Sequence, residues 1–108
     1  MSDKLLIDRI RQFLSLRKGY SERSMFGTVC FMINGNMCAS VWQESLIVRL
    51  GKNGYDKVLT EPHVKPADMN GRIMKEWVLV NSAGIKSDEN LAKWLERATE
   101  FSGSLPPK

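Results

Sequence analysis

The chain is poor in the residues that build catalytic and metal sites. Among its 108 residues it has a single histidine, His63, and two cysteines, Cys30 and Cys38. A zinc site needs about four Cys, His or carboxylate ligands, and a nucleophilic triad needs a histidine beside its nucleophile. His63 lies between Pro62 and Lys65-Pro66, in a stretch that we expect to be a surface loop. We therefore predict a protein that is not an enzyme, with no metal, no cofactor and no catalytic residue.

Long hydrophobic runs are also missing. No apolar run approaches the roughly 20 residues that a membrane-spanning helix needs. The first eight residues alternate acidic and basic side chains and lack a basic leader followed by an apolar segment. We expect a cytoplasmic protein with no membrane contact. Glycine-rich phosphate loops and helix-turn-helix patterns are absent as well.

Positive charge is only mildly in excess. The net charge is +4, with 43% hydrophobic and 26% charged residues, and the cations are scattered along the chain. This balance is typical of an ordinary globular protein and permits either a nucleic acid or an acidic protein as a partner. The length predicts one domain over residues 1–108.

The clearest structural signal in the sequence is that of a β-hairpin. Asn34-Gly35 separates two apolar runs, at about 25–33 and 36–42, and Asn-Gly is the strongest short-range hairpin signal. A two-residue loop would place Phe31 opposite Cys38 and would point the two thiols to opposite faces of the sheet. We expect buried, inert thiols and no disulfide.

The other elements follow from periodicity and from capping residues. A helix over about 2–17 is indicated by a stripe of apolar residues: Leu6, Ile10, Phe13 and Leu14. Residues 20–24 read as a connector. A third strand is predicted at 45–50, a short helix at 54–60, and a strand at 75–81 that follows a second Asn-Gly at 70–71. Ser87 then begins a helix that places Trp94 in the core and ends at Gly103.

The predicted fold is therefore α+β, in the order α-β-β-β-α-β-β-α. We expect a two-layer structure with a largely antiparallel sheet and the helices on one face. On the face that the helices leave uncovered, apolar side chains such as Phe31 with Cys38, or Met32 with Met37 on the opposite face, would need a partner. We therefore also expect a homodimer formed through the sheet or its edge.

Two stretches carry a family resemblance. One is Arg23-Ser-Met-Phe-Gly27 followed by the hairpin. The other is Lys65-Pro66 followed by Asn70-Gly-Arg-Ile-Met-Lys-Glu-Trp-Val78. Together with the closing helix, they resemble the TfoX/Sxy N-terminal domain family. The resemblance implies a secretion-chaperone-like fold and a link to the regulation of competence for DNA uptake. We expect a stand-alone copy of this domain. Thr28 departs from the family pattern, which often has a second glycine there.

The resemblance implies no catalytic residues. We interpret five of the matching residues as structural: Met25, Phe26, Gly27, Met74 and Trp77. Packing explains the cations Arg23, Arg72 and Lys75 less well, so we predict that they form a binding surface. The resulting hypothesis is a regulatory or adaptor domain that acts through a protein partner. The alternative is a weak nucleic-acid-binding module in transcriptional regulation.

Overall fold

The computed structural model describes residues 2–25, 27–69 and 72–107, with the side chains of residues 2, 3, 25, 69 and 72 left aside. The elements follow one another in this order: α1 (Ser2–Leu14), β1 (Tyr20–Met25), β2 (Thr28–Ile33), β3 (Asn36–Trp42), β4 (Ser45–Arg49), α2 (Gly51–Val58), β5 (Val64–Met69), β6 (Arg72–Val80), the 3-10 helix η1 (Ser82–Ile85) and α3 (Asp88–Ser104).

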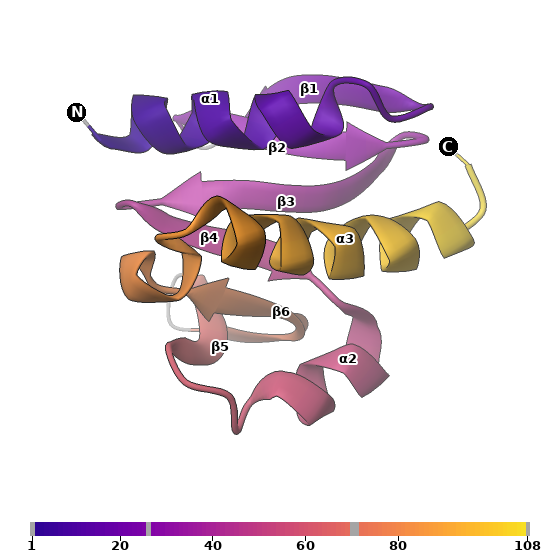
Figure 1. Ribbon diagram of the computed structural model, residues 1–108. Helices are drawn as coiled ribbons and strands as arrows, with labels where there is room; N and C mark the ends of the chain where they lie inside the picture. Colours follow the sequence, from indigo (N-terminus) through magenta and orange to yellow (C-terminus); the bar gives the residue numbers. More distant parts are fainter. Residues whose placement is uncertain (1, 26, 70–71, 108) are drawn as a thin grey trace.

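All six strands form one antiparallel sheet in the order β1-β2-β3-β4-β6-β5. Helices α1 and α3 lie side by side across one face of this sheet, and α2 lies on the same side near β6 (Figure 1). The predicted α+β class, with helices covering one face, is confirmed. No helix among the described residues is long and apolar enough to cross a membrane.

The core lies between the sheet and the helices. Leu6, Ile10 and Leu14 of α1 are buried there, as their spacing predicts, together with Trp94 of α3. Phe13 was expected in the same stripe but is 36% exposed. Helix α1 ends at Leu14, three residues before the predicted end.

The predicted connector at residues 20–24 is wrong, because these residues form the edge strand β1. Tyr20 pairs with Ile33 and Met25 pairs with Thr28 in an unbroken antiparallel register. Most of the strand is polar, so its sequence carries no alternation of apolar and polar residues. Its backbone hydrogen bonds to β2, rather than buried side chains, hold it in the sheet.

The Asn34-Gly35 turn is confirmed, with φ angles of +53° and +82°. Ile33 pairs with Asn36 as expected, but the register shifts beyond Met32, and Phe31 then opposes Ala39 instead of Cys38. Cys38 is the extra residue of a bulge.

Three boundaries in the second half also differ from expectation. Helix α2 begins at Gly51, and the proline loop is shorter than predicted because β5 already begins at Val64. Strand β6 begins at Arg72, whereas the Asn70-Gly71 turn lies outside the described residues. Ser87 caps α3 as predicted, its hydroxyl accepting a hydrogen bond from the amide of Asn90 at 3.1 Å. The helix continues one residue past Gly103.

Candidate functional site

The sheet face opposite the helices contains a groove of about 740 Å³. Side chains alternate between the two faces of a strand. In β4, Leu46 and Val48 therefore enter the helix-covered core, whereas Ile47 lies in the groove. Strands β2 to β6 all contribute to the lining. The expectation of apolar side chains on the uncovered face is confirmed for Met37, which lines the groove, whereas Phe31 and Cys38 lie in the helix-covered core.

One row of residues crosses all six strands on this face. In pairing order it consists of Arg23, Cys30, Ser40, Ile47, Leu79 and Lys65. The four central residues are small or apolar, and the residue at each edge is an exposed cation. Adjacent strands are about 4.8 Å apart, so the two cations are separated by roughly 24 Å along a flat sheet. The row is therefore uncharged and mostly apolar in the middle and positive at both ends.

Aromatic side chains line the groove beside this row. Trp42 is 52% exposed at the end of β3, and Trp77 of β6 is half-buried. The guanidinium of Arg49 lies 5.9 Å from the centroid of the Trp77 ring and 5.5 Å from that of Phe101. Its Nε atom is 3.5 Å from Oε1 of Glu76. Arg49 is thus held by two rings and a carboxylate, so Lys65 is the less constrained cation of the groove lining.

The two thiols lie on opposite faces, as predicted. Cys30 lines the groove, where its thiol donates to the hydroxyl of Ser40 at 3.8 Å, and that hydroxyl donates to the carbonyl oxygen of Val29 at 3.1 Å. Cys38 lies in the core, and burial raises the pKa of its thiol to about 11. Cys38 is therefore protonated at neutral pH, and both cysteines are buried and free.

The structure does not bring Arg23 together with Lys75. Arg23 lies on the edge strand β1, whereas Lys75 lies on β6, with three strands between them. Both are exposed, and the side chain of Arg72 is outside the described set. Within the described part of the chain, neither Arg23 nor Lys75 has an ion-pair partner. The acidic residue next to each of them is paired elsewhere: Glu22 with Arg11 and Glu76 with Arg49.

The residues predicted to be structural also lie in different parts of the structure. Met74 is half-buried and, like Trp77, lines the groove. Gly27 has a φ of +75°, and no atom lies within 4 Å of the position that a Cβ would occupy. Phe26 and the side chain of Met25 lie outside the described residues. Lone His63 is exposed, also with a positive φ of +69°.

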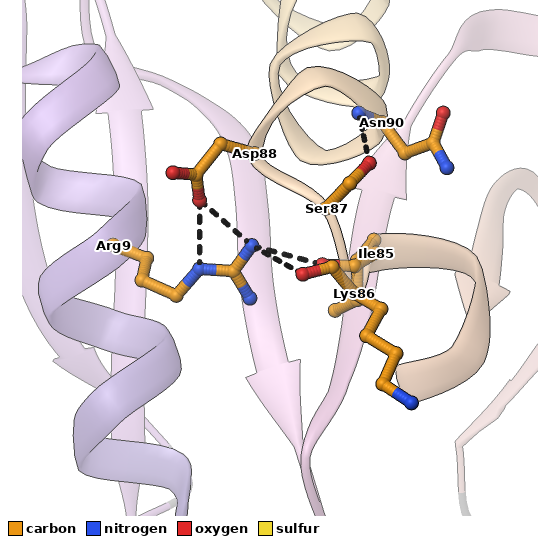
Figure 2. Close-up of polar contacts among 6 residues, drawn as sticks. All are labelled: Arg9, Ile85, Lys86, Ser87, Asp88 and Asn90. Carbon is orange, nitrogen blue, oxygen red and sulfur yellow. Dashed lines mark hydrogen bonds and ion pairs between the residues drawn. The ribbon is translucent and has the colours of Figure 1, made fainter.

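Two polar clusters on the helix-covered side hold α1 in place. Arg9 forms an ion pair with Asp88 at 3.0 Å and donates to the carbonyl oxygens of Ile85 and Lys86, which ties α1 to the start of α3 (Figure 2). Arg11 donates from Nε and from Nη2 to the two carboxylate oxygens of Glu22, each at 2.8 Å. These contacts give Arg9 and Arg11 a structural role, which is to hold α1 against the rest of the fold.

Comparison with known protein families identifies the family of this chain, which the geometry of the groove alone does not. The model of the TfoX N-terminal domain matches residues 12–102. The chain belongs to this family. This is a family of regulatory domains. Among curated proteins, none matches the chain.

The TfoX N-terminal domain match contains the whole groove and omits most of α1. The groove residues that sequence reasoning did not predict as binding residues include Trp42, Ile47 and Lys65. A usable signal was present for one of them. Ile47 alternates with Leu46 and Val48, so all three cannot face the same core. No local pattern indicated that Trp42 would be exposed or that Lys65 would lie on an edge strand beside the groove.

Proposed function

We propose that this TfoX N-terminal domain is a regulatory adaptor that binds a protein partner in the groove of its uncovered sheet face. The observation that carries the proposal is the row from Arg23 to Lys65, which is uncharged and mostly apolar in the middle and positive at both edges. The complementary ligand is a segment with an apolar centre and a carboxylate toward each end. Apolar burial would supply the affinity, and the flanking charges would fix its register.

A binding role fits the chemistry of the groove better than a catalytic one. The nucleophile candidate, Cys30, is 2% exposed, and its neighbour is the neutral hydroxyl of Ser40. The described lining residues include no histidine to act as a base. Trp42 has the size and exposure of the aromatic anchors that dominate protein interfaces.

A random peptide library displayed on phage tests this proposal against the immobilised domain. We expect enriched peptides to carry apolar residues flanked by Asp or Glu. A double charge reversal, R23E with K65E, should abolish the selection of peptides with acidic flanks. K18E with K93E changes the net charge equally at exposed positions on α3 and in the loop after α1, and should leave the selected pattern unchanged.

The groove itself is tested with W42A, which removes an exposed side chain and should leave thermal stability intact. We expect the selected peptides to bind this variant at least 10-fold more weakly, as for an aromatic hot spot. The proposal fails if the library yields no enrichment, or if R23E with K65E selects the same peptides as the unmodified domain.

A second candidate, weak nucleic-acid binding in transcriptional regulation, is favoured by one observation. Arg23 and Lys75 are exposed, and the acidic residues next to them, Glu22 and Glu76, are paired with other arginines. Unpaired cations on a sheet are free to contact phosphates. Their separation over β1 and β6 implies scattered contacts rather than one compact site.

A further inference from the structure

The two edges of the sheet differ in how well they are protected against another strand. Edge strand β5 contains Pro66, which has no N–H, and its register shifts between Pro66 and Ala67. Proline and bulges are devices that block edge-to-edge pairing. Edge strand β1 contains neither, and its register with β2 is unbroken from Tyr20 to Met25. The edge at β1 is therefore the one open to strand addition.

The backbone groups that β1 offers can be identified from the hairpin. In an antiparallel pair, residues alternate between pointing their N–H and C=O toward the neighbouring strand and away from it. The carbonyl oxygen of Gly19 accepts a bond from the amide of Asn34 at 2.9 Å, so residue 19 points inward. Two-residue alternation then directs the carbonyl of Tyr20 and both backbone groups of Glu22 and Ser24 outward, whereas the amide of Tyr20 donates to the carbonyl oxygen of Arg17 at 3.2 Å. Residues 21–24 are exposed, so none of the described elements covers this edge.

We propose that β1 pairs antiparallel with β1 of a second copy, with Glu22 opposite Glu22 of that copy. Opposite residues in an antiparallel pair share a face. Tyr20 and Glu22 face α1, whereas Arg23 faces the groove. A two-fold axis normal to the sheet leaves each side chain of β1 on the same face in both copies. One residue of β1 must therefore lie directly opposite the same residue of the second copy, at the centre of the pairing. The longest such registers centre on Glu22 or on Arg23.

The charges select Glu22 as the centre. Both registers use the backbone groups of Glu22 and Ser24, and the amide of Tyr20 already donates to the carbonyl oxygen of Arg17 at 3.2 Å. Arg23 opposite its own copy, however, would place two free cations together. The carboxylate of Glu22 is neutralised by Arg11 through two 2.8 Å bonds. Two such ion pairs side by side form an alternating charge cluster.

The consequence is a continuous sheet in which both grooves open on the same face. Two linked sites of this kind would bind a partner with repeated segments more tightly than one site. The pairing itself does not rest on the proposed function of the groove, because none of the outward groups of β1 lines that groove.

Disulfide trapping tests the register. In the proposed pairing, the two Glu22 Cα atoms lie about 5.5 Å apart, which is within disulfide range. Ser24 would lie about 13 Å from Ser24 of the second copy. We expect E22C to form a covalent dimer under mild oxidation, R23C to react more slowly and S24C to remain monomeric. Unmodified protein, with its two buried thiols, is the control. Faster trapping of R23C, or no trapping of E22C, would overturn the proposal.

A second variant tests the unmodified assembly in solution. S24P removes an outward N–H without breaking a bond to β2, so the fold should persist. We expect sedimentation to show a micromolar dimer for the unmodified chain and at least 10-fold weaker dimerisation for S24P, at equal thermal stability. A mass of about 12.3 kDa throughout the micromolar range, or a dimer that S24P leaves unchanged, would contradict the pairing.

Discussion

Gly51 lies directly against the ring of Phe101. A Cβ atom added at residue 51 would be 2.4 Å from Cε1 of Phe101, and Gly51 has a φ of +76°. This contact joins the start of α2 to the last turns of α3. Glycine is required here both by backbone conformation and by the lack of space. We expect G51A to lower the free energy of unfolding by about 3 kcal/mol, combining left-handed strain with overpacking.

Gly103 provides the matched control for this substitution. It lies in α3, and no atom occupies the 4 Å around the position of its Cβ. We expect G103A to raise the free energy of unfolding by about 0.5 kcal/mol, because alanine restricts the unfolded chain and favours helix. Urea denaturation measures both variants. Similar midpoints for G51A and G103A would show that the Phe101 contact is unimportant.

The turn at Gly35 supplies a second test. Its φ of +82° is a conformation that a β-branched residue resists. We expect G35V to destabilise the fold by about 1 kcal/mol or more. An unchanged urea midpoint and slope would be incompatible with the turn geometry.

The turn between β3 and β4 has similar geometry without a glycine. Gln43 and Glu44 have φ angles of +46° and +66°, so both central residues are left-handed. Asparagine tolerates this conformation better than glutamine. We expect Q43N to raise the free energy of unfolding by about 0.5 kcal/mol, measured by urea denaturation. Q12N, at an exposed position within α1, is the control and should be neutral or slightly destabilising.

Acid should weaken the contact between α1 and β1. The hydrogen bonds from Arg11 hold the pKa of Glu22 below its usual value of 4.5. As the pH falls, the unfolded chain therefore takes up this proton before the folded chain does. The stabilisation from Glu22 is complete above pH 4.5 and is lost progressively below it. We expect E22Q to remove this part of the pH dependence. Parallel acid titrations of the two proteins, rather than converging ones, would disprove the coupling.

Nucleic-acid binding makes a quantitative prediction about salt. If Arg23, Arg72 and Lys75 each neutralise one phosphate of duplex DNA, the logarithm of affinity should fall with the logarithm of salt concentration with a slope of about −3. The triple alanine variant should flatten this slope by about the same amount without lowering thermal stability. Fluorescence anisotropy at about 50 mM salt measures the starting affinity. No binding at about 100 µM protein, the weak end of non-specific affinities, would leave only the protein-partner function.

Local signals in the sequence were sufficient for several elements. Asn34-Gly35 specifies its turn through the φ angles that these two residues tolerate, and Ser87 specifies the start of α3 through its own hydroxyl. The stripe of Leu6, Ile10 and Leu14 likewise predicted the buried face of α1. In each case the cause lies within a few residues of its effect. The family, and with it the regulatory class, was also recognisable from short motifs.

The tertiary structure alone decided where the groove lies. β1 is a strand because β2 offers it hydrogen-bonding partners, and its own side chains do not indicate one. Cys38 becomes a bulge residue because the pairing of β3 with β2 shifts beyond Met32. Arg23 and Lys65 are 42 residues apart in sequence, yet cross-strand pairing places them at opposite ends of one row. Sequence determined which segments could form strands, whereas the order of those strands in the sheet determined which residues face the groove together, because pairing partners come from distant parts of the chain.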